Sequence, residues 1–187
     1  MTSEVTLVAT SQQINLLVVV DTEYVKGITK NPSKDWRAPT GINHSGQFML
    51  CTGARGPVKG QGTGDLEFMA YPGDLVSFTG TSIYDNSDDA VLVYGIQHFA
   101  GDIVFNYPFN YNALQRNGAA QPNPESPDHN GLPAIQKPEI FPSLDSRVAR
   151  SGREGFGICF GLYTLVGGQK QELFGYYWWD PYVSVAG

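Results

Sequence analysis

The stretch GTSIYDNSDDAVLVYGIQHF, residues Gly80–Phe99, joins an acidic loop to the most apolar strand that the chain predicts. Its second half, Ala90–Ile96, is apolar on both faces of an extended strand, and such a strand needs cover on both sides. We therefore expect Ala90–Ile96 to lie in the interior of the fold. The loop before it, Tyr84–Asp89, holds three aspartates and an asparagine. A rigid strand beside this loop would present those side chains for binding.

A second buried strand is predicted at Ile14–Val20, which is apolar except for Asn15 and rich in β-branched residues. Further strand signals recur at short intervals with turn residues between them, as at Tyr71–Asp74, where Pro and Gly suit a type II turn. No segment shows a sustained helical period. The sequence predicts one all-β domain over residues 1–187, an antiparallel β-sandwich of jelly-roll or Greek-key type rather than a closed barrel.

One segment does not fit this pattern. Seven of the twelve prolines fall between Pro108 and Pro142, among many Asn, Gln and Gly residues. Residues 112–154 therefore predict a long loop excursion with little periodicity. Within it, Ser143–Ser151 predicts two helical turns capped by Ser143. Trp36 lies in another predicted loop, where we expect its ring to pin the loop to the core.

The composition of the chain limits the kinds of molecule that it is expected to bind. With a net charge of -6 and a pI near 4.9, the chain has no electrostatic reason to bind nucleic acid or an anionic membrane surface. No apolar window approaches the length of a membrane span. The N-terminal residues MTSEVTLVATSQQ lack the basic and apolar regions of a signal peptide, so a cytoplasmic protein is expected. Cys51 and Cys159 are then expected to be buried free thiols.

No catalytic set can be assembled from the sequence. The three histidines lack zinc-ligand spacing, and no nucleophile motif is present, so an enzyme is the least favoured reading. Asp85, Ser87 and Asp89 have the spacing that opens a calcium loop, but Ile96 stands where an EF-hand needs Glu. Calcium held by Asp21, Asp85 and Asp89 from separate loops stays a hypothesis. The alternative is that these residues only form turns.

Four aromatic residues at Tyr176–Trp179 are followed directly by Asp180. In a strand, one alternate pair belongs to the core and the other is partly exposed. An exposed ring stacks on the apolar face of a sugar, while carboxylates and amides bind its hydroxyls. We expect Trp179 to be the stacking ring of a glycan site where three strand ends meet. The predicted ligand-binding residues are Asp21, Thr22, Asp85, Asn86, Asp88, Asp89, Trp179 and Asp180.

Several motifs occur in one order along the chain: DTEYVK at Asp21–Lys26, NPS at 31–33, PTGI at 39–42, GQGTGDLEF at 60–68, SIYDNSDDAVLVYGI at 82–96 and WDP at 179–181. Together they resemble the PixA/AidA family of bacterial inclusion body proteins. The resemblance implies a cytoplasmic protein that accumulates as inclusions under quorum or growth-phase control and is linked to host association. It implies no enzyme activity, and it agrees with a glycan-binding role.

The leading hypothesis is therefore a non-enzymatic, lectin-like carbohydrate-binding protein that also self-associates. The alternative is a self-assembling inclusion or storage protein with no small-molecule ligand. Calcium is the one cofactor considered, and a glycan and further copies of the chain are the expected partners.

Overall fold

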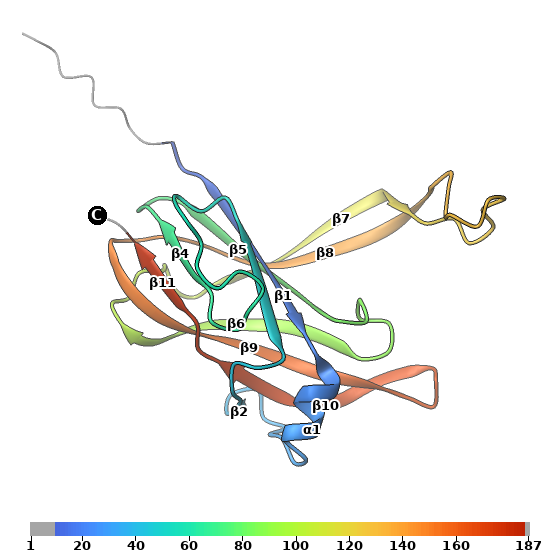
Figure 1. Ribbon diagram of the computed structural model, residues 1–187, viewed down its shortest axis with the longest axis horizontal. Coiled ribbons are helices and arrows are strands. Elements are labelled where there is room, and N and C mark those ends of the chain that lie inside the picture. Colours follow the sequence, from blue (N-terminus) through green and yellow to red (C-terminus); the bar gives the residue numbers. More distant parts are fainter. Residues whose placement is uncertain (1–9, 186–187) are drawn as a thin grey trace, which may run out of the picture.

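Two β-sheets packed face to face form the body of the protein (Figure 1). The computed structural model describes residues 10–185. In chain order the elements are β1 (Gln13–Val20), α1 (Thr22–Ile28), β2 (Thr40–Gly41), β3 (Gln47–Thr52), β4 (Glu67–Ala70), β5 (Leu75–Ser82), β6 (Ala90–Gly101), β7 (Asn110–Gln121), β8 (Ile135–Arg147), β9 (Gly152–Val166), β10 (Lys170–Trp179) and β11 (Tyr182–Val185). The first sheet has the order β3-β1-β5-β8-β7. The second has the order β2-β10-β9-β11-β4, with β6 paired to β9. The predicted all-β sandwich is confirmed.

Both sheets are mixed, whereas the sequence predicted antiparallel sheets. β1 runs parallel to β5, β10 parallel to β2, and β11 parallel to β4. Parallel neighbours need a long connection rather than a hairpin. The chain between β1 and β5 supplies one, because it contains α1, β2, β3 and β4.

The predicted strand at Ile14–Val20 is confirmed and lies inside the first sheet, between β3 and β5. Alternate side chains from Ile14 to Val20 are buried in the core between the sheets. The other face is more open, and Leu17 there is 37% exposed. An apolar residue on the outer face of a strand therefore did not require cover on that side.

The strand predicted at Ala90–Ile96 forms as β6, but its expected place in the interior is wrong. Among the described residues β6 pairs only with β9, so it is an edge strand. A β-bulge between Val93 and Gly95 shifts the alternation, so that Ile96 joins Val91 on the buried face. Leu92 points outward and is 48% exposed. The apolar residues on the second face cover an outer surface and not a second core.

The predicted loop excursion is instead a long hairpin of β7 and β8, which projects from the body (Figure 1). We call residues 110–143 the arm. Ser143–Arg147, predicted as part of a helix, belongs to β8. Residues of the arm are exposed on both faces, so no hydrophobic alternation marked it in the sequence. Prolines fit there because β8 has no partner other than β7 along the arm.

A buried carboxylate fixes the chain just before the arm. Glu154 is fully buried, and its Oε2 accepts hydrogen bonds from the backbone N–H groups of Val104 and Phe105 at 2.6 and 3.1 Å. Its Oε1 accepts one from the Tyr107 hydroxyl at 2.8 Å. These bonds attach the segment that leads into β7 to the middle of the sandwich. The arm therefore starts from a rigid base.

Cys51 and Cys159 are buried and unbridged, which confirms the predicted free thiols. Burial raises the pKa of each thiol to about 11. Both side chains are therefore protonated and unreactive at neutral pH. Within residues 10–185, no helix has the length and apolar character needed to cross a membrane.

Candidate functional site

Part of the predicted acidic site does assemble, as an ion pair. Asp21 caps helix α1 and accepts a hydrogen bond from the Tyr24 N–H at 3.0 Å. One turn later, Lys26 places its Nζ 2.6 Å from Oδ2 of Asp89. Thr22 is buried beside the same carboxylate. Burial alone would raise the pKa of Asp89, but the Lys26 ammonium, together with the nearby Thr164 and Thr22 hydroxyls, outweighs burial and lowers that pKa. The carboxylate is thus matched by a cation of the protein itself.

The acidic loop is held from inside by an amide side chain. Oδ1 of Asn86 accepts from the N–H groups of Ser82 at 2.8 Å and Val91 at 2.9 Å, so it ties the end of β5 to the start of β6. Asp85 and Asn86 have left-handed backbone conformations, with φ of 52° and 59°. Asn and Asp tolerate this conformation better than other side chains. Asn86 therefore stabilises the turn of this loop.

Asp180 lies in a different cluster. Its Oδ1 is 3.2 Å from Nε2 of His44, and the Nδ1 of His44 contacts Asp65. Burial would lower the pKa of His44, but hydrogen bonds to the two carboxylates outweigh it and raise that pKa. No sequence motif indicates this arrangement, because His44, Asp65 and Asp180 are far apart along the chain.

Trp179 is not the exposed ring that the sequence predicted. Its side chain is 1% exposed, and its Nε1 donates to the carbonyl of Gly64 at 3.2 Å. The predicted meeting point of the three strand ends is also wrong. Along β9, Ala90 lies opposite Tyr163 and Trp179 lies opposite Ile158. At the usual strand rise these positions are about 17 Å apart. The start of β6 and the end of β10 therefore form separate sites.

The tentative calcium ligands are not gathered together either. Among the residues that the structure describes, no group of three or more His, Cys, Asp or Glu side chains has a geometry suited to a metal ion. Asp21 is used as a helix cap, and Asp89 is paired with Lys26. Asp21 and Asp89 thus have structural partners within the protein.

A hollow of aromatic rings, which the sequence did not predict, lies on the outer face of the second sheet. It has a volume of about 210 Å³. Its walls are Trp36, Leu92, Tyr94, Gly161, Tyr163 and Tyr176. Tyr177 and Trp179 occupy the core, so the other alternate pair, Tyr176 and Trp178, lies on the outer face. The expected division of the four aromatics is correct, but the exposed pair is the opposite of the one that included Trp179.

Trp36 forms one side of this hollow and is 50% exposed. Its ring meets Tyr94 edge to face with centroids 6.3 Å apart, and Tyr94 donates its hydroxyl proton to the Trp36 carbonyl at 2.8 Å. Tyr94 in turn contacts Tyr176 edge to face at 5.4 Å. The expectation that Trp36 pins its loop to the core is therefore wrong. Tyr94 holds the loop, and the indole stays half exposed, with the Arg37 guanidinium stacked over the ring 4.3 Å from its centroid.

The floor of the hollow is a glycine. Gly161 lies between Leu92 and Tyr176 in a row across three strands. A Cβ at this position would come within 3.1 Å of Tyr163 and 3.2 Å of Tyr176. Burial, together with the neighbouring Tyr176 side chain, raises the pKa of Tyr163. The absent side chain keeps the hollow open between the rings.

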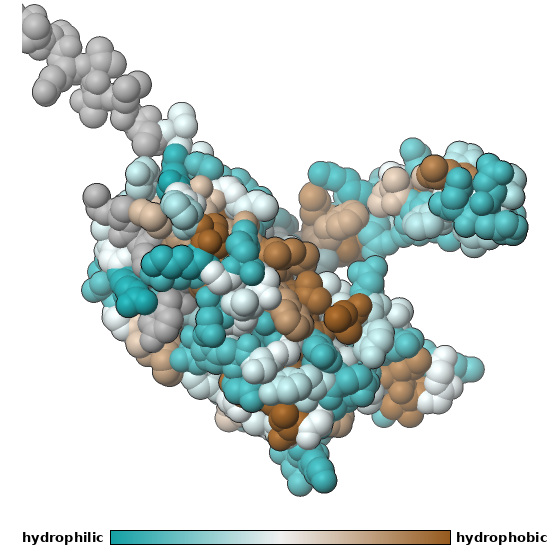
Figure 2. Space-filling model, in the orientation of Figure 1, coloured by the Kyte–Doolittle hydropathy of each residue, from teal (hydrophilic) through white to brown (hydrophobic). Residues whose placement is uncertain are grey.

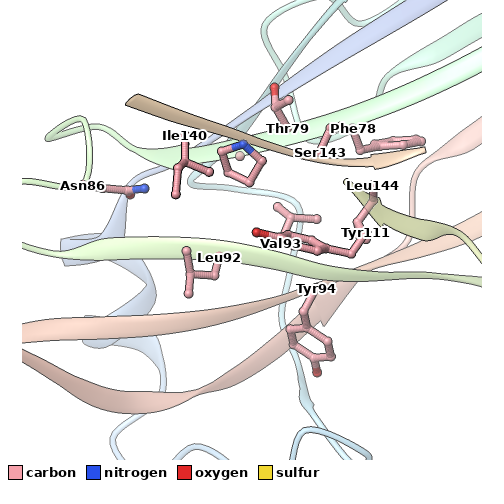
Figure 3. A pocket seen from close by; sticks show the side chains of 12 residues that line it. Phe78, Thr79, Asn86, Leu92, Val93, Tyr94, Tyr111, Ile140, Ser143 and Leu144 are labelled. Atoms are coloured by element: carbon pink, nitrogen blue, oxygen red, sulfur yellow. The ribbon is translucent and has the colours of Figure 1, made fainter. Parts of the chain in front are cut away.

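A larger pocket of about 430 Å³ lies beside the hollow at the edge of β6, and Leu92 and Tyr94 line both (Figure 3). It opens between β5, β6 and the base of the arm. Phe78, Thr79, Val93, Tyr111, Ile140 and Pro142 are among its lining residues. The pocket exists because the second sheet ends at β6, while the first sheet continues into β7 and β8.

Two packed sheets with an aromatic hollow on one outer face define a β-sandwich protein with a candidate binding surface. A family model described as PixA, inclusion body protein, matches residues 12–185. The crystal structure of an inclusion body protein of this family from Burkholderia cenocepacia J2315 is similar, with a TM-score of 0.76 and 32% sequence identity. The similarity covers 96% of this chain and 99% of that chain. The chain belongs to the PixA family of inclusion body proteins. No curated protein matches it.

These matches confirm the resemblance seen in the sequence and extend it. The family match includes residues 112–154, which carry no motif of their own. The arm is therefore part of the matched unit.

Proposed function

We propose that this PixA-family protein acts by binding a glycan in the aromatic hollow, and not by catalysis. The observation that carries the proposal is the half-exposed indole of Trp36, which is held by its edge-to-face contact with Tyr94 and by the Arg37 guanidinium over the ring, and which leaves its remaining surface for a ligand. A ring fixed in this way loses little conformational freedom when a ligand stacks on it. The proposed site thus moves from Trp179 and the acidic loop to Trp36 and its neighbours.

The chemistry of the hollow suits a sugar. The C–H face of a pyranose is apolar and packs on an aromatic ring, while its hydroxyls need hydrogen-bonding groups at the edge. Tyr163 and Tyr176 supply hydroxyls, and the carboxylate of Asp35 lies near enough to Tyr94 to interact with it electrostatically. An aromatic wall with a few polar groups at its rim is typical of small-ligand sites.

The test begins with a glycan array, followed by titration of the best hit against the wild type and Trp36→Ala. Loss of the stacking ring costs on the order of 1 kcal/mol beyond lost area, so we expect at least a fivefold weaker affinity, roughly. Tyr71→Ala is the matched control, because Tyr71 is also an exposed ring but lies in the turn between β4 and β5. Asp88→Ala tests the acidic loop. An effect of Asp88→Ala without one of Trp36→Ala would return the site to that loop.

Self-association without a small-molecule ligand is the second candidate function. The family description, inclusion body protein, and the exposed arm favour it. The two candidates are separable, since the hollow and the arm are different surfaces. Accumulation in the cytoplasm, growth-phase or quorum control and host association remain predictions from the family resemblance.

A further inference from the structure

The inner face of the arm continues the core face of the first sheet. Leu144 of β8 is paired with Phe78 of β5, and both are buried in the core. Leu144 also lies opposite Tyr111 of β7. Because residues opposite each other share a face, the pairs Ala113–Pro142 and Gln115–Ile140 extend that same face along the arm. The surface that is covered by the second sheet in the body is uncovered in the arm.

This uncovered face is uncharged and strongly exposed, with Gln115 as the polar side chain among these pairs. Tyr111 is 67% exposed and Ile140 is 56% exposed. A two-stranded hairpin alone is at best marginally stable in water, and further strands or packing against another element are needed to stabilise it. Figure 1 shows the arm standing away from the body, and at the base of the arm Tyr111 and Ile140 face Leu92 and Val93 of β6 only across an open pocket. We therefore expect the inner face of the arm to pack against another molecule.

The pocket beneath the arm is a complementary surface on the same chain. Its lining residues from the body include Phe78, Leu92 and Val93, and no lining residue is charged. The edge strand β6 beside it has no second neighbour within residues 10–185, so it can accept a further strand. Figure 2 shows apolar side chains at the base of the arm and on the body beside the open notch.

We propose that the arm of a second copy of this chain occupies this pocket, and that the two copies exchange arms around a twofold axis. Each copy carries both surfaces, which is the requirement for a closed, reciprocal interface. Each copy also has a net charge of -6, so two copies can approach most easily through uncharged surfaces. The inner face of the arm and the pocket are such surfaces.

The size of the arm agrees with a stable dimer. β7 has 12 residues and β8 has 13. A standard interface takes roughly 20 to 30 residues from each partner. Only alternate residues lie on the inner face, so an exchanged arm contributes about half of one interface side, and the pocket of the same copy contributes further residues. The inference names the surfaces of assembly, and it does not depend on glycan binding in the hollow.

The first experiment measures the mass of the full-length protein by analytical ultracentrifugation over a range of concentrations. We expect a wild-type dimer. Ile140→Asp puts a charge on the inner face and should raise the dissociation constant at least tenfold, roughly, as expected for a charge buried in an apolar contact. Leu114→Asp is the matched control, because Leu114 is 43% exposed on the opposite face of the same hairpin and should leave the dimer intact.

A wild type that is monomeric at every concentration would contradict the proposal. The arm would then bind a molecule other than a second copy of this chain. A dimer that survives Ile140→Asp, or that only Leu114→Asp disrupts, would contradict it too. Circular dichroism shows whether each variant is folded.

A cross-linking experiment covers the case in which Ile140→Asp fails to fold. Equal amounts of Ile140→Cys and Leu92→Cys are mixed and treated with a short bismaleimide. Cys51 and Cys159 are buried and protonated, so they should not react. Exchange of arms predicts a linked pair containing one chain of each variant. Absence of that mixed pair, with both thiols accessible, would overturn the proposal.

Discussion

Lys26 and Asp89 join helix α1 to the start of β6, with Nζ 2.6 Å from Oδ2 and only 6% of the Asp89 side chain exposed. Removing one partner of a buried pair leaves the other charge uncompensated. We expect Asp89→Ala to lower the free energy of unfolding by about 2 to 3 kcal/mol, less than for a fully buried pair because Lys26 is 21% exposed. Urea unfolding measures this. If Asp89→Ala and Lys26→Met together destabilise as much as the sum of the two single variants, the coupling is absent.

Stability should fall in acid because Asp74 and Asp89 have lowered pKa values. For Asp74, burial would raise the pKa, but bonds from Arg55 and from the N–H groups of Tyr71 and Gln12 outweigh it. A carboxyl whose folded pKa lies below 3.8 stabilises the fold above that value, and this stability is lost as pH falls through the folded pKa. Urea unfolding at pH 5 and pH 3 should show a loss that is smaller in Asp89→Asn. An equal loss in both proteins would contradict this origin.

His44, in contrast, should make the free energy of unfolding fall as pH rises. Its folded pKa is raised above 6.5, so its stabilisation is complete below 6.5 and is lost as pH rises through the folded pKa. Unfolding measured between pH 6 and pH 9 should show a decline that is absent in His44→Gln. The effect is modest, since the His44 side chain is 32% exposed. A decline that persists in His44→Gln would have another source.

Substitutions of Trp36 and Trp179 should differ sharply in their effect on the free energy of unfolding. Trp179 is fully packed, so Trp179→Ala should cost about 3 to 5 kcal/mol through the cavity that it leaves. Trp36→Ala removes a half-exposed ring and should cost about 1 kcal/mol or less. Thermal unfolding of both variants tests the contrast. Similar losses would mean that Trp36 is part of the core.

Much of the fold was predictable, because β1 and β6 carry clear strand patterns and the turn at Tyr71–Asp74 carries turn residues. The edge position of β6 was not, because it depends on the order of strands in the sheet, where β6 pairs with β9 alone among the described residues. The arm was hidden, since neither of its faces is buried within one chain.

The candidate site was harder to predict than the fold. The alternation at Tyr176–Trp179 indicated one exposed pair, but nothing local decides which face of an aromatic strand meets the core. The hollow also needs Trp36, from a loop that no periodicity links to β10. The acidic residues were predicted to bind a ligand because they cluster in sequence. In the structure, Asp89 is paired with Lys26, and Asp180 is paired with His44. Pairing of this kind depends on contacts across the fold.

The central claim, a glycan site at Trp36, is tested most directly by the indole N–H signals in a nitrogen-15 NMR spectrum. The chain has three tryptophans, and Trp36→Phe assigns the signal of Trp36. On titration with a glycan selected by the array, the Trp36 signal should shift with the binding curve. The signal of Trp179, whose N–H is buried against Gly64, should stay in place. Saturable binding that leaves the Trp36 signal unmoved would contradict the account.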